Sequence, residues 1–162
     1  MAMTKLGTDI NGVIITYTAT SNADVTEELL EAMKKILRTQ IADSSGGVLY
    51  NLNSIHISST SEACGAHTDL NGPHRSGRAV DIDMINNKGV RVNYPTDDEV
   101  QSICDALQVS ASLDPNVVEN FGPLACFQPY KGGYIQIGGE SNKTLIEQHK
   151  SHLHFGVVKR KD

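Results

Sequence analysis

The pattern of apolar and polar residues predicts an amphipathic helix from Asp24 to Arg38. Its apolar side chains recur with helical spacing on one face and are Val25, Leu29, Met33, Ile36 and Leu37. Asp24 and Glu27 have the spacing of a capping box at the start of this helix. The turn-forming sequence SSGG at 44–47 prevents its continuation.

A second amphipathic helix is expected from Thr96 to Gln108. Thr96 and Glu99 again have the spacing of a capping box. The apolar stripe of this helix consists of Val100, Ile103, Cys104 and Leu107. Cys104 is therefore expected to be a core residue.

Five other segments have the composition or the two-residue period of β-strands. They are residues 11–20, 54–58, 78–85, 132–137 and 152–159. The polar stretch from Ser59 to Pro73 is long for a connection inside a domain, and such long loops are often functional. Helices and strands are interleaved, but their lengths do not suit regular βαβ units. We therefore expect one α+β domain over residues 1–162, with a small antiparallel sheet and helices packed against it.

Composition narrows the class of protein. A hydrophobic fraction of 39% and a charged fraction of 20% are typical of a soluble globular domain. A net charge of −5 argues against a nucleic-acid partner, because such proteins usually carry a basic surface. No apolar run approaches the ~20 residues of a membrane span, and residues 1–20 lack the features of a signal peptide. We expect a monomer that is made in the cytoplasm without a signal peptide.

The three cysteines do not suggest a disulfide framework. Cys64, Cys104 and Cys126 are odd in number and widely spaced, without a CxxC pair. This usage is typical of reduced thiols in a cytoplasmic product.

Two segments carry residues that commonly bind metal. In the sequence HLHFGV, His152 and His154 should lie on one face of a strand, opposite the apolar side chains between and after them. In VDIDM, Asp81 and Asp83 should share one face in the same way. Pairing of the two strands would therefore create a cluster of acids and imidazoles on the sheet.

Strand geometry also limits what the histidines can do. Residues i and i+2 are roughly 6.5–7 Å apart along a strand. One metal ligand and one neighbouring helper is therefore an easier arrangement for His152 and His154 than two ligands. His74 precedes the strand of Asp81, and Gly77 permits a tight backbone course that could bring His74 back over Asp81.

Together these residues resemble a family of zinc peptidases. The pattern His74-x-x-Gly77-x-Ala79-x-Asp81, followed by His152-x-His154, is similar to that of D-alanyl-D-alanine carboxypeptidases and phage L-alanyl-D-glutamate endopeptidases. The resemblance extends from Ile55 to Val157 and implies the fold shared by lysostaphin-type enzymes and the hedgehog domain. It implies zinc ligands at His74, Asp81 and His154, and a catalytic role for His152.

The chain departs from the family pattern at three points. Gly72 stands where many members have Ser, and Ser151 stands where many have a catalytic Glu. The sequence SSTSE at 58–62 lacks the Arg that holds the substrate carboxylate in many members. The zinc ligands therefore transfer to this chain better than the base or the substrate clamp.

These parts predict a mechanism. Zinc lowers the pKa of bound water from roughly 15.7 to about 7 and polarises a carbonyl. His152 would act as general base or stabilise the oxyanion, while Asp83 could orient an imidazole. Arg75 and Arg78 could pair with a peptide carboxylate. Two imidazoles and one carboxylate suit zinc, although the ligand types alone also admit manganese or cobalt.

Other candidates have ordinary explanations. His56 and His67 are as readily surface residues as members of the site, and His149 is expected in a loop. Ser151 stands where many family members have a catalytic Glu. Glu119 is the best acidic alternative to that missing Glu, and a structural role is favoured for it.

The leading hypothesis is a zinc-dependent peptidase that cleaves peptidoglycan at the bacterial cell wall, as a phage lysin or a related bacteriolytic factor. The alternatives are a zinc-stabilised binding or virion-structure domain without turnover, and a zinc hydrolase of another amide.

Overall fold

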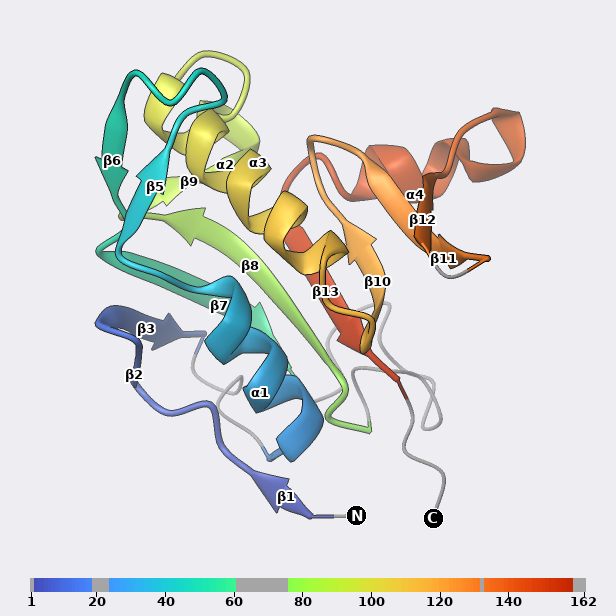
Figure 1. Cartoon of the computed structure of the whole chain (residues 1–162), viewed down its shortest axis with the longest axis horizontal. Coiled ribbons are helices and arrows are strands. Elements are labelled where there is room, and N and C mark those ends of the chain that lie inside the picture. Colours follow the sequence, from blue (N-terminus) through green and yellow to red (C-terminus); the bar gives the residue numbers. More distant parts are fainter. Residues whose placement is uncertain (1, 19–23, 61–75, 132, 159–162) are drawn as a thin grey trace.

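The computed structural model describes residues 2–18, 24–60, 76–131 and 133–158 (Figure 1). Its centre is a mixed sheet with the strand order β12-β11-β10-β13-β8-β7-β3-β2, and β9 pairs with β8 as the ninth strand. The bounds are β2 Asp9–Ile10, β3 Val13–Tyr17, β7 Ser54–Ser59, β8 Ala79–Ile85, β9 Lys88–Gly89, β10 Val117–Phe121, β11 Cys126–Tyr130, β12 Gly133–Gln136 and β13 Leu153–Val157.

The sheet is larger than the sequence predicts and is not wholly antiparallel. Among its described strands, β3 and β7 run parallel, and the other neighbours run antiparallel. Two short ribbons are separate from it: β1 (Met3–Thr4) pairs with β4 (Val25–Thr26), and β5 (Gln40–Ala42) pairs with β6 (Leu49–Asn51). The α+β class is correct, and the expectation of a small sheet is wrong.

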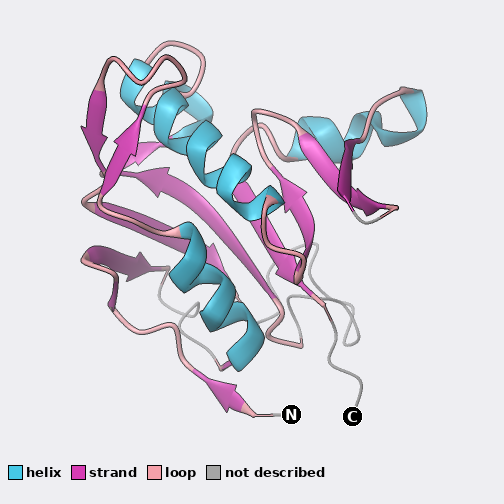
Figure 2. Cartoon of the chain, viewed as in Figure 1, coloured by secondary structure: helices cyan, strands magenta, loops and turns pink. Residues whose placement is uncertain are grey.

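Helices α1 (Glu27–Ile36) and α3 (Asp98–Ser112) cover one face of the sheet (Figure 2). Shorter helical segments are α2 (Val90–Asn93), the 3-10 turn η1 (Glu140–Asn142) and α4 (Lys143–Gln148). Over the described residues, the helices are too short or too polar to cross a membrane.

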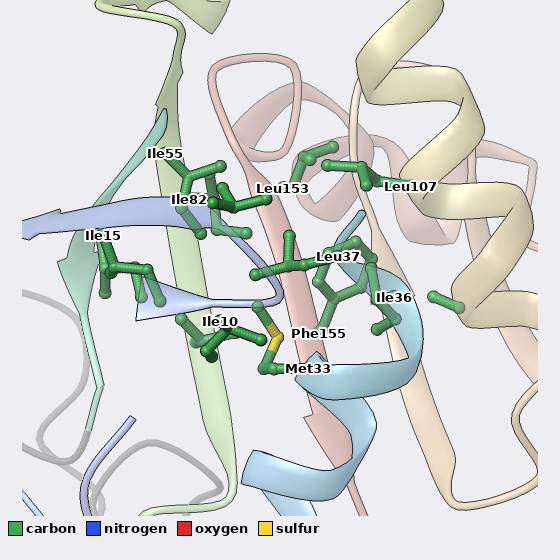
Figure 3. Close-up of a cluster of buried hydrophobic side chains, with 14 of the residues drawn as sticks. Ile10, Ile15, Met33, Ile36, Leu37, Ile55, Ile82, Leu107, Leu153 and Phe155 are labelled. Atoms are coloured by element: carbon green, nitrogen blue, oxygen red, sulfur yellow. The ribbon is translucent and has the colours of Figure 1, made fainter. Parts of the chain in front are cut away.

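The core lies between these two helices and the sheet (Figure 3). Met33 and Ile36 of α1 and Leu107 of α3 face the strands and are fully buried. The sheet contributes Ile82 from β8 and Phe155 from β13, also without exposed surface. Cys104 is buried in this core, as the helical stripe predicts.

Both helices begin later than the sequence predicts. Thr26 is the N-cap of α1, and its hydroxyl accepts the Leu29 amide at 3.3 Å. Asp97 is the N-cap of α3, and its carboxylate accepts the Val100 amide at 3.1 Å. The capping boxes predicted at Asp24 and Thr96 are therefore wrong, because a nearer hydroxyl or carboxylate reaches the free amides.

Gly77 allows a tight backbone conformation just before β8. Its φ of +71° is a conformation that glycine adopts without strain. A Cβ at this position would lie 2.8 Å from the Asp24 carbonyl oxygen, and the Gly77 carbonyl accepts the Thr26 amide at 2.9 Å. The tight course predicted at Gly77 is confirmed, and it brings the start of β8 against the start of α1.

Candidate metal centre

The pairing of β8 with β13 aligns the two polar patterns found in the sequence. Asp81 lies opposite His154, and Ile82 lies opposite Leu153. Because side chains alternate along each strand, Ile82 and Leu153 enter the core beneath the helices. Asp81 and His154 therefore share the face that α1 and α3 do not cover.

One carboxylate oxygen is the meeting point of the cluster. Oδ1 of Asp81 lies 2.8 Å from Nδ1 of His154 and 3.6 Å from Nε2 of His152. Asp81 and His154 are each only 5% exposed. Two strands that are distant in sequence thus bring three of the predicted site residues together.

Glu119 joins this cluster from β10, the strand on the other side of β13. Its Oε1 lies 3.2 Å from Nε2 of His154. Glu119 is the register partner of Gly156, next to an irregularity in the β10–β13 pairing. A side chain at Gly156 would overlap with the Glu119 carboxylate and lie 3.1 Å from its Cβ. Glycine therefore leaves the space in which the Glu119 side chain lies.

His154 is enclosed by two carboxylates, which control its protonation. Burial lowers its pKa, but hydrogen bonds to Asp81 and Glu119 more than offset this effect and raise the pKa to about 9. The imidazolium can donate Nδ1–H to Asp81 and Nε2–H to Glu119. The protonated, positively charged imidazole is thus favoured between the two carboxylates.

Aromatic rings line the other sides of His154. Phe121, its register partner on β10, stacks on the imidazole with centroids 5.3 Å apart and an interplanar angle of 13°. His149 follows α4 and packs edge-on, 5.5 Å from His154 and 4.9 Å from His152. Nδ1 of His149 lies 2.7 Å from the Leu145 carbonyl, and burial lowers the pKa of His149. His149 is thus a neutral, buried part of the cluster rather than a simple loop residue.

Ser151 contacts the ring of His152. Its hydroxyl lies 3.3 Å from the Gln148 carbonyl and 2.9 Å from Nδ1 of His152. If the hydroxyl proton goes to the carbonyl, Ser151 Oγ accepts Nδ1–H and Nε2 is unprotonated; if it goes to Nδ1, Nε2 carries the ring proton toward Asp81. The first arrangement is the one that a general base requires.

The surroundings of Asp83 do not match its predicted role of orienting an imidazole. Its Oδ1 is buried without a hydrogen-bond partner among the described residues, and burial raises its pKa. The largest opposing influence on this pKa is His56, whose ring contacts hydroxyls of Thr16 and Thr18. No contact with His152 or His154 supports an orienting role for Asp83 within the described chain.

An open cavity adjoins the cluster. It has a volume of about 480 Å³, and Asp81, His152, Ser151 and Arg91 are among its lining residues. A second cavity of about 670 Å³ shares Arg91 and Ser151 with the first, so the two cavities are adjacent, and the pair is referred to as the groove.

Arg91 is the basic side chain at the junction of the two cavities, and sequence reasoning did not select it. It belongs to the short helix α2, which carries no recognisable motif. Arg91 makes no hydrogen bond or ion pair with the described residues, whereas Nε of Arg78 donates to Ser76 at 2.7 Å.

The described residues supply only part of the expected ligand set. His74 and Arg75 lie outside them. Within residues 2–18, 24–60, 76–131 and 133–158, no group of three His, Cys, Asp or Glu side chains is arranged to hold a metal. Asp81 and His154 supply two donor types that zinc accepts. Tetrahedral zinc with bonds of roughly 2.0–2.2 Å places two donors about 3.3–3.6 Å apart, so this pair, 2.8 Å apart, would have to separate slightly to hold one ion.

Comparisons with models of protein families, with curated proteins and with solved structures found no match to this chain.

Proposed function

We propose that this protein is a zinc-dependent hydrolase that cleaves peptide bonds in bacterial cell-wall peptidoglycan. The observation that carries the proposal is the convergence of His152 and His154 on one oxygen of Asp81, beside an open cavity. Asp81 and His154 offer a carboxylate and an imidazole, two donor types of a catalytic zinc centre, and His152 places a second imidazole beside them.

Asp81 and His154 would hold the metal together with His74, the third ligand implied by the sequence pattern. When bound, zinc polarises a carbonyl group and makes water more acidic. Ala79, on the same strand as Asp81, is completely buried and adds little bulk to that face. The chain itself must then supply a base, a binding surface for the peptide and control of water.

His152 is the general base in this proposal. Its side chain is 21% exposed, compared with 6% for His154, so it is the imidazole more accessible to water. In the arrangement that this role requires, Ser151 Oγ accepts Nδ1–H and Nε2 is able to accept a proton. Ser151, which occupies the position of the Glu in the related pattern, thus acquires a role through His152.

The groove supports an extended ligand with an acidic group. Arg91 lies where the two cavities meet, next to Ser151, and a guanidinium binds a carboxylate through paired hydrogen bonds. Arg75 and Arg78 remain predicted substrate contacts from the sequence. Peptidoglycan as the substrate, the bacterial cell wall as the site of action and a phage lysin as the type of enzyme rest on the sequence resemblance.

The second candidate is a zinc-stabilised binding or virion-structure domain without turnover. The observation in its favour is the burial of Asp81 and His154, each 5% exposed, since structural zinc sites are closed. The exposed edge of His152 and the adjoining cavity favour catalysis instead.

The test uses purified full-length protein loaded with zinc and incubated with isolated peptidoglycan, with and without a chelator. Mass spectrometry of the soluble products identifies any newly released amino groups and the bond that is cut. We expect zinc-dependent release of stem-peptide fragments. Stoichiometric zinc binding without any release would favour the non-catalytic domain and refute the hydrolase.

A further inference from the structure

We propose that Glu119 is a positioning residue, which accepts the Nε2 proton of His154 and thereby reserves Nδ1 for the metal. This inference rests on the proposed zinc centre and deepens it by assigning the ligand atom and its support. Glu119 lies on β10, outside both motifs, and is not a metal ligand in this arrangement.

The two ring nitrogens of His154 face different surroundings. On the Nδ1 side, Oδ1 of Asp81 lies 2.8 Å away and is approached at 3.6 Å by Nε2 of His152. On the Nε2 side is Oε1 of Glu119, at 3.2 Å. Among the described residues, the Asp81 carboxylate and the His152 ring therefore lie on the Nδ1 side, and the Glu119 carboxylate lies on the Nε2 side.

A neutral imidazole carries a proton on one nitrogen and a lone pair on the other. If Glu119 accepts Nε2–H, the lone pair is at Nδ1 and points toward Asp81. Metal-binding histidines usually donate their second N–H to a carboxylate or carbonyl, which fixes the ring and makes it a better ligand. Glu119 provides such an acceptor.

The backbone is arranged to let Glu119 reach this position. Its register partner is Gly156, and a Cβ there would overlap with the Glu119 carboxylate. Gly156 does not have a positive φ, so alanine is acceptable to the backbone, and the three atoms nearest to the added Cβ all belong to Glu119. Phe121, two residues after Glu119, stacks on His154 and restricts rotation of the ring.

The proposal predicts a specific loss of metal affinity. Removing such a partner of a ligand typically weakens metal binding by about 10- to 100-fold. Zinc affinity would be measured by chelator competition on the full chain for E119A, E119Q and G156A. The control is E140Q, which removes an exposed carboxylate from η1, away from this strand pair.

We expect E119A to lose about 10- to 100-fold in zinc affinity. E119Q should lose less, because its amide oxygen still accepts Nε2–H, and E140Q should match the original chain. G156A should resemble E119A although it retains the carboxylate. The double variant E119A/G156A should lose no more than E119A alone, since both changes act through one contact.

A spectroscopic measurement separates positioning from general stability. Long-range ¹H–¹⁵N NMR of the zinc-loaded protein should show His154 protonated at Nε2 and metal-bound at Nδ1. Melting of the metal-free variants identifies any that fail to fold. In that case, E119Q and the His154 spectrum of the original chain still test the inference.

Two results would overturn this inference and leave the metal centre standing. One is a zinc affinity of folded E119A and G156A that equals that of the original chain. The other is metal bound at Nε2 of His154. Failure of the original chain to bind zinc would overturn the metal centre as well. Zinc binding without hydrolysis would refute only the proposed activity.

Discussion

Asp81 and His154 are 73 positions apart in the chain, yet their Oδ1 and Nδ1 atoms lie 2.8 Å apart. Direct register between β8 and β13 produces this contact. A carboxylate oxygen and an imidazole nitrogen at this distance need a cation between them, which is a proton in the metal-free protein. Binding of zinc must displace that proton, and several measurable consequences follow from this competition.

The metal-free protein should lose stability as pH rises. Burial lowers the pKa of His154, but Asp81 and Glu119 raise it to about 9, above the ordinary value of 6.5. The folded state therefore binds the proton more tightly than the unfolded state. Its contribution is complete below about pH 6.5 and is lost as pH increases through about 9. At about 1.4 kcal/mol for each pH unit, a few kcal/mol are involved.

Urea unfolding in the presence of a chelator, between pH 6 and pH 10, would measure this effect. The H154Q variant, which lacks the titrating group, should show a much flatter profile. Equal pH dependence in both proteins would show that His154 is not the group responsible.

Substitutions of the two histidines of the HxH motif should have different effects on zinc binding and on turnover. His154→Ala removes a predicted ligand and should abolish both zinc binding and peptidoglycan cleavage. His152→Ala removes the base and should retain zinc while turnover falls by about 10²- to 10⁴-fold. Zinc content by mass spectrometry, together with cleavage rates, distinguishes them. Equal loss of zinc would mean that both histidines are ligands.

Ser151→Ala should affect turnover without affecting the metal. In the proposed arrangement the hydroxyl oxygen accepts the Nδ1 proton of His152, and its loss permits the tautomer in which Nε2 cannot accept a proton. We expect kcat to fall about fivefold, in line with one neutral hydrogen bond of about 1 kcal/mol. S141A is a matched control on η1. An unchanged pH–rate profile and kcat in S151A would argue against this role.

Arg91→Ala should weaken substrate binding more than Arg78→Ala. Arg91 lines both cavities, whereas Arg78 donates a hydrogen bond to Ser76. Loss of a charged hydrogen bond at about 1.5 kcal/mol corresponds to a roughly tenfold rise in KM. Initial rates on soluble muropeptides would provide the comparison. A larger effect at Arg78 would favour the contact predicted from the sequence.

Short-range patterns explain why much of the site was predictable. The alternation in VDIDM and HLHFGV places Asp81, His152 and His154 on polar strand faces, and the observed register confirms that these faces align. The amphipathic stripes of α1 and α3 are equally local signals. His74 and Arg75, however, lie outside the described residues, so their predicted roles stay predictions.

The parts that were missed depend on contacts between distant segments. The strand β10 has the sequence VVENF, in which two polar residues interrupt the apolar pattern, and its pairing with β13 comes from the tertiary fold. Glu119 reaches His154 because Gly156 of the neighbouring strand makes room. Arg91 is near the cluster only because α2 packs beside β8, which no local pattern indicates.

The strand β13 comes after every other described strand in the sequence, yet it occupies the interior of the sheet between β10 and β8. Until it inserts, the sheet is two separate pieces, each with a row of unpaired backbone groups that could pair with another chain. Joining them requires contacts over long sequence separations, which slows folding. The same event that seals these aggregation-prone edges also delivers His154 to Asp81, so the centre can form only in a chain that has already passed its most vulnerable stage.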